Sequence, residues 1–125
     1  MLLLAMPVFS QFIDYTLVSS DNELGMELSR AKYGINITLL LYHASAFEFV
    51  SIEKSAEQNS GFRQCKYIAL NGTANDSIVI VQRDIYPLVY SQDVFYRVKT
   101  VSREGVTRIY PPVRMPGSQN PAQEN

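Results

Sequence analysis

The chain has 125 residues, of which 46% are hydrophobic and 18% are charged, and its formal net charge is −1. This length suits one domain with a sizeable core, and the apolar content excludes a disordered protein. The near-neutral charge provides no overall field for nucleic acid or for an anionic membrane. One cysteine and one histidine exclude a disulfide scaffold and a Cys/His metal cage, so we predict no metal and no other cofactor.

The first ten residues resemble the end of an export signal. They are apolar and uncharged, and Val8 and Ser10 stand at the −3 and −1 positions of a cut before Gln11. The stretch has no basic region and its apolar run is short, so we expect that further residues, including Lys or Arg, precede Met1. The alternative is a hydrophobic first strand in the core. The signal interpretation predicts export to the periplasm, the outer-membrane surface or the extracellular space, with no membrane span.

The clearest strand signal runs from Gly34 to Tyr42. Ile35, Ile37, Leu39 and Leu41 point one way in a period of two, and the opposite face also becomes apolar toward the end, which predicts a central strand. By the same criteria, further strands are predicted at residues 12–19, 47–55, 62–70, 77–83, 94–102 and 106–110.

Turn signals separate these strands. Gly105, after Arg103 and Glu104, suits the left-handed position of a tight hairpin, and the proline pair at 111–112 ends the last strand as an edge. Residues 26–32 fit either a helical turn or an edge strand, and both interpretations stay open. Residues 115–125 lack apolar anchors and predict a disordered tail. Short strands without a long amphipathic helix predict one antiparallel β-sandwich over residues 11–114, after a signal remnant at 1–10.

Four stretches of the chain resemble a known domain type. They are Val50-Ser-Ile-Glu-Lys-Ser55, Gly61-Phe62, and Val94 to Gly105 followed by Arg108-Ile-Tyr110. They resemble the fibronectin type III-like (immunoglobulin-like) domains of bacterial secreted proteins, of the kind often found before type IX secretion sorting domains. The resemblance covers roughly residues 34–113. It implies an all-β, fibronectin type III/immunoglobulin-like antiparallel sandwich of six to seven strands, at the bacterial cell envelope.

Catalytic and metal-binding constellations are weak in this sequence. His43, the single histidine, precedes Ser45, and a Ser–His–Asp arrangement would need Asp84 or Asp93, but no Gly-x-Ser-x-Gly elbow is present. Aspartates at strand ends ordinarily cap turns, and no spaced calcium loop occurs among them. Cys65 lies in an apolar run, where a buried, inert thiol is favoured over a reactive one. We therefore predict no catalytic residue.

A binding surface is the remaining candidate site. In a hairpin, Arg97, Lys99 and Arg108 could share one face, although a solvated sheet face with protective edge charges is the favoured interpretation, because the patch is small. Tyr42 and Tyr110 are predicted to be partly exposed and complete the candidate surface. Tyr96 is assigned to the core by periodicity.

These features together predict a non-catalytic exported β-sandwich module. It would mediate protein binding or assembly at the bacterial cell envelope, with an envelope or secreted protein as partner and no nucleic acid. The alternatives are a carbohydrate-binding accessory domain, which would display coplanar aromatic rings to a glycan, and, less favoured, a small hydrolase centred on His43.

Overall fold

Antiparallel strands make up most of the residues that the structure describes. The computed structural model describes residues 15–19, 24–31, 34–70, 76–85 and 92–117. The signal-like stretch therefore lies outside the described residues. The elements in chain order are β1 (Tyr15–Ser19), β2 (Leu24–Ala31), β3 (Gly34–Tyr42), the short 3-10 helix η2 (Ala44–Ala46), β4 (Phe47–Ser55), β5 (Arg63–Ala69), β6 (Ser77–Asp84), β7 (Val94–Ser102), β8 (Thr107–Ile109) and β9 (Val113–Met115).

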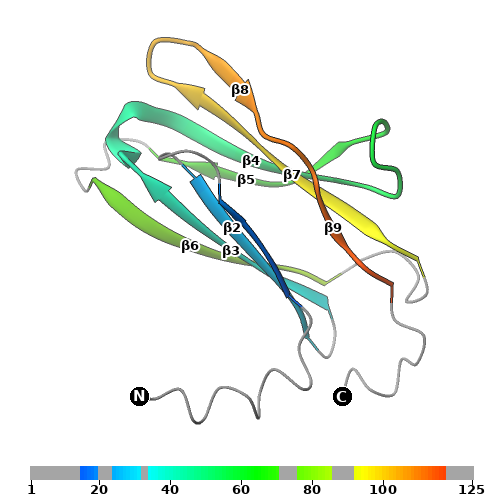
Figure 1. Cartoon of the computed structure of the whole chain (residues 1–125). Helices are drawn as coiled ribbons and strands as arrows, with labels where there is room; N and C mark the ends of the chain where they lie inside the picture. Colours follow the sequence, from blue (N-terminus) through cyan, green and yellow to red (C-terminus); the bar gives the residue numbers. More distant parts are fainter. Residues whose placement is uncertain (1–14, 20–23, 32–33, 71–75, 86–91, 118–125) are drawn as a thin grey trace, which may run out of the picture.

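The strands form two sheets that face each other (Figure 1). The four-stranded sheet has the order β1-β2-β3-β6, and the five-stranded sheet has the order β5-β4-β7-β8, with β9 also paired to β7. The chain changes sheet after β3, after β5 and after β6, so hairpins within one sheet alternate with crossovers to the other. This antiparallel β-sandwich confirms the predicted fold class. The part of the chain that the structure describes contains nine strands, more than the six to seven expected.

The core fills the space between the sheets, as the alternation of side chains predicts. Ile35, Ile37, Leu39 and Leu41 of β3 are fully buried. β3 lies between β2 and β6, which confirms that it is an inner strand. A buried aliphatic side chain of this size contributes roughly 1.5 to 3 kcal/mol relative to exposure. The facing sheet supplies Val50, Ile52, Val94, Tyr96 and Val98.

Residues 26–31 of the ambiguous segment 26–32 form an inner strand, neither a helical turn nor an edge, whereas residue 32 lies outside the described residues. The strand is part of β2, which pairs with β1 on one side and β3 on the other. Leu24, Met26 and Leu28 are buried at every second position. Pairing on both sides resolves the ambiguity, because a segment with a strand on each side satisfies its backbone groups only in the extended conformation.

The C-terminal edge contains the second unpredicted strand. Pro111 and Pro112 end β8, and the chain then resumes pairing with β7 as β9. Met115, expected to begin a disordered tail, is fully buried at the end of β9. The amide of Gly117 donates a hydrogen bond of 2.9 Å to Asp93 Oδ1. The prediction that a disordered tail begins at residue 115 is therefore wrong, because Met115 and Gly117 contact the sandwich. Residues 118–125 lie outside the described residues.

Candidate functional site

The three basic residues of the predicted surface do not share one face. Arg97 and Lys99 alternate along β7 with buried neighbours and point outward from the five-stranded sheet. Arg108 pairs in register with Thr100, whose side chain is buried between the sheets, so Arg108 extends on the opposite face of the hairpin. Its guanidinium lies over the ring of Tyr110, 4.7 Å from the centroid. The cross-strand register of β7 and β8 therefore divides the expected basic patch.

The two tyrosines of the predicted surface are also separated. Tyr110 is only 3% exposed, so the expectation that it is a surface residue is wrong. Its backbone amide donates to the Val98 carbonyl, which holds it against the sandwich after β8. Tyr42 is exposed at the end of β3, on the other sheet. Arg97 and Lys99 are thus the members that the fold keeps together.

A row of side chains crosses the outer face of the five-stranded sheet beside these two residues. Strand register aligns Tyr67 of β5, Ser51 of β4, Lys99 of β7 and Ile109 of β8. Tyr67 is 55% exposed and Ile109 is 50% exposed, at the two ends of the row. We call these four residues the outer row. Its two large exposed apolar groups flank a cation, a composition that suits contact with another molecule.

An aromatic ring and a polar side chain beside the outer row support its β5 end. The ring of Phe49 lies 4.9 Å from that of Tyr67, between centroids, and the two planes are tilted by 38°. Ser51 donates a hydrogen bond of 2.8 Å to Gln64. These contacts hold the β5 end of the row in place on the sheet.

The charge of Arg97 is neutralised within the same face. Its Nε lies 2.7 Å from Oε1 of Glu53, which is directly opposite on β4. The guanidinium also stacks over Phe62, 4.2 Å from the ring centroid. The Glu53 side chain is 11% exposed and that of Arg97 is 27% exposed, so the pair is partly shielded from solvent. Opposite charges at directly paired positions stabilise a sheet, and Arg97 is accordingly a structural residue as much as a surface residue.

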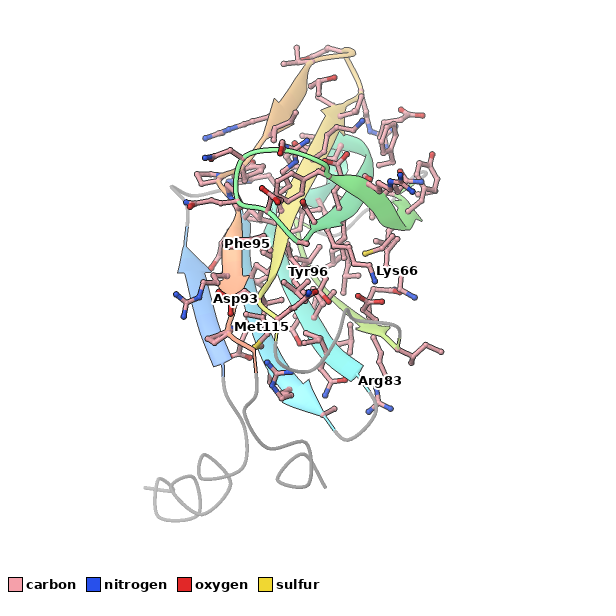
Figure 2. The ribbon with its side chains drawn as sticks, turned by 90° about the vertical axis from the view of Figure 1, so that its right-hand side faces the viewer. Lys66, Arg83, Asp93, Phe95, Tyr96 and Met115 are labelled. Atoms are coloured by element: carbon pink, nitrogen blue, oxygen red, sulfur yellow. The ribbon has the colours of Figure 1, made fainter. Side chains whose placement is uncertain are left out.

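A buried polar cluster that sequence reasoning missed lies between the sheets. Lys54 Nζ is 2.8 Å from Oδ2 and 3.1 Å from Oδ1 of Asp84, and the Tyr96 hydroxyl donates a 2.7 Å hydrogen bond to Oδ2. Burial and this hydrogen bond raise the pKa of Tyr96 above its ordinary value. Figure 2 shows Tyr96 within the sandwich. The signal available in the sequence was Lys54 at an inward position of an alternating strand, two residues after Ile52.

The Ser–His–Asp arrangement weighed for His43 cannot include Asp84. Asp84 pairs with Ile35 at the start of β3, whereas His43 follows the end of that strand, about 25 Å away along it. Asp93 is engaged elsewhere, with Arg114 Nε at 3.3 Å and the amide of Gly117.

Across residues 15–19, 24–31, 34–70, 76–85 and 92–117, no three His, Cys, Asp or Glu side chains are grouped so as to hold a metal ion. No helix in that part of the chain has the length and apolar content to cross a membrane. No family model, no curated protein and no solved structure matches the chain.

Proposed function

We propose that the protein is a non-catalytic exported module that binds a protein partner, or assembles with one, at the bacterial cell envelope. The observation that carries the binding role is the outer row, in which Tyr67 and Ile109 expose about half of their surface on either side of Lys99. Protein interfaces concentrate their binding energy in a few aromatic and apolar anchors within a polar rim. A rigid sheet holds these anchors without any cost of ordering a loop.

The envelope location rests on the signal-like first residues and on the resemblance to fibronectin type III-like domains. The motif stretches at residues 50–55 and 94–105 form β4 and β7, which are adjacent in the five-stranded sheet. The pairs β3–β6 and β4–β7 lie in opposite sheets, as the B–E and C–F pairs do in immunoglobulin-like sandwiches. Both features support the resemblance.

The geometry favours a protein ligand over a glycan. A carbohydrate-binding face would display coplanar rings that stack on sugar planes, whereas the rings of Phe49 and Tyr67 are tilted by 38°. Phe49, on the same face of the sheet, is also half-buried.

The binding role is tested with tagged protein recovered from its native source. The bait is compared with a variant that carries Tyr67→Lys and Ile109→Lys, called the row variant, and with one that carries Val79→Lys and Val81→Lys, called the edge variant. All four positions are at least half exposed, so both variants should fold, and both add the same charge. We expect an envelope protein to bind the wild type and the edge variant, and to be lost from the row variant. Equal capture by the row variant, or no specific capture by the wild type, would refute the proposal.

Export is tested on the same material by a separate measurement. Sequencing of the purified protein from its N-terminus should begin at Gln11 if the signal interpretation holds. A first residue at or before Met1 would refute the export component and leave the binding result untouched.

A further inference from the structure

Lys99 carries the single charge of the outer row. Across the part of the chain that the structure describes, no carboxylate forms an ion pair with it. Arg97, the next outward residue of β7, differs in this respect, because Glu53 lies directly opposite it on β4 and pairs with it. The outer row therefore presents a cation whose charge the described sandwich does not balance.

The cross-strand neighbours of Lys99 bring no negative charge to it. On one side is Ser51 of β4, which is fully buried and donates its hydroxyl hydrogen to Gln64. On the other side is Ile109 of β8. Lys99 itself is half-buried. A lysine in such a position packs its methylene stem on neighbouring side chains and keeps its ammonium group in water.

The two apolar ends of the outer row are too far apart for one partner side chain to cover both. Tyr67 and Ile109 lie in the same register row on β5 and β8, three strand spacings apart, which is about 14 Å. A partner that covers both must therefore bring two apolar groups. Whatever it places between them meets the cation of Lys99.

We propose that the outer row binds a protein segment in which a carboxylate lies between two apolar side chains. The carboxylate pairs with Lys99, and the apolar groups cover Tyr67 and Ile109. Complementary charge at this position fixes how the two proteins align and disfavours partners with a cation there. The inference rests on the proposed function, which requires only that the outer row binds a protein.

A carboxylate suits this position better than a phosphate group. Glu53 lies diagonally from Lys99 across β4 and β7, at about 7 to 8 Å. Its negative charge repels a doubly charged phosphate more strongly than a singly charged carboxylate. The nearest second cation on β7, Arg97, is already paired with Glu53.

The first experiment joins the proposed contact covalently. The full chain, bound to the envelope protein that it captures from its native source, is treated with a carbodiimide. This reagent activates a carboxyl group, and an adjacent lysine amine then displaces the activating group as a urea and forms an amide. Peptide mass spectrometry should find Lys99 joined to an Asp or Glu of the captured protein. An intact complex in which Lys99 is joined to no partner carboxylate would count against the inference.

The second experiment measures the dissociation constant of the purified pair for charge variants. Lys99→Glu should raise it at least about tenfold, and Lys99→Gln by a smaller factor, because reversal adds repulsion to the lost attraction. The matched control is Arg83→Glu, the same charge reversal at an exposed position on the four-stranded sheet, which should change it little. Circular dichroism and the urea midpoint check that the variants fold.

A reciprocal substitution completes the test. Replacing the partner carboxylate found by cross-linking with lysine should restore binding to Lys99→Glu and weaken binding to the wild type. Unchanged affinity of both Lys99→Glu and Lys99→Gln would overturn the inference.

Failure of the inference is distinguishable from failure of the proposed function. If the row variant loses the captured protein while Lys99→Glu binds it fully, the acidic partner is refuted and the binding role stands. If the wild type captures no protein specifically, both are refuted.

Discussion

Cys65 shows how one residue's surroundings set its chemistry. It is half-buried on β5 and packs against the core, and its pKa is raised to about 11, chiefly by burial and next by the charge of Asp84. Near neutral pH the thiol is therefore protonated and a poor nucleophile. This agrees with the inert thiol expected from the apolar run around it.

The raised pKa predicts a distinctive reactivity profile. At pH 8 only about one Cys65 thiol in a thousand is ionised, and the rate of alkylation by iodoacetamide should rise about tenfold for each pH unit up to pH 10. In the urea-unfolded chain the rate should level off near the ordinary pKa of 9.0. Labelling is followed by mass spectrometry. A plateau below pH 9 in the folded protein would contradict the assignment.

The raised pKa of Cys65 also makes the free energy of unfolding depend on pH in the alkaline range. Because the folded pKa lies above the unfolded value, the folded state retains a proton that the unfolded state has released. The stabilisation is present in full below about pH 9 and is lost as pH rises through about 11. Cys65→Ala should remove this component from the pH dependence of the urea midpoint.

At the scale of the strands, the pairing of β3 with β6 depends on a close approach between the backbones of Gly34 and Asp84. A Cβ on Gly34 would lie 2.4 Å from the backbone oxygen of Asp84, closer than real contacts allow. Gly34→Ala should therefore push the end of β6 away from β3 and lower the free energy of unfolding by about 1 to 3 kcal/mol.

The control for Gly34 is Gly105, where φ is +88° and nothing lies within 4 Å of an added Cβ. Gly105→Ala should cost about 1 to 2 kcal/mol through backbone conformation alone. Both losses are measured by urea unfolding. Amide exchange separates the mechanisms, since the β6 amides near Asp84 should exchange faster only in Gly34→Ala. Unchanged exchange there would contradict the steric explanation.

The alternation of apolar and polar residues along the sequence predicted β3, β4 and β7, but it did not predict β2 or β9. In β2, Leu24, Met26 and Leu28 follow a period of two, yet Leu24, Leu28 and Ala31 also fit helical spacing. The segment becomes a strand because β1 and β3 pair with both of its sides. β9 has three residues, too few for any period to show, and it exists because β7 extends beyond the end of β8.

At the scale of the whole molecule, the Lys54–Asp84–Tyr96 cluster connects the two sheets. Asp84 comes from β6 in one sheet, and Lys54 and Tyr96 come from the directly paired β4 and β7 in the other. Removing one partner of a buried pair leaves the other charge without compensation.

Asp84→Asn should therefore lower the free energy of unfolding by about 2 to 4 kcal/mol. Tyr96→Phe, which removes one hydrogen bond and keeps the ring, should cost about 1 to 2 kcal/mol. Urea unfolding of the single and double variants gives the coupling energy between Asp84 and Tyr96. The double variant should lose less free energy of unfolding than the sum of the two single losses. An Asp84→Asn variant as stable as the wild type would show that the cluster does not hold the sheets together.

The sequence by itself determined the all-β class, the inward faces of β3, β4 and β7, and the hairpin at Gly105. These follow from local properties, because the period of a strand and the backbone of a turn depend on neighbouring residues. Only the tertiary structure decided that Arg97 pairs with Glu53 and that Arg108 lies on the other face from Lys99. It also decided that Tyr110 is buried, and that β6 is a sheet edge. Those outcomes depend on which distant strands pair and in what register, and this is settled only when all the strands pack together.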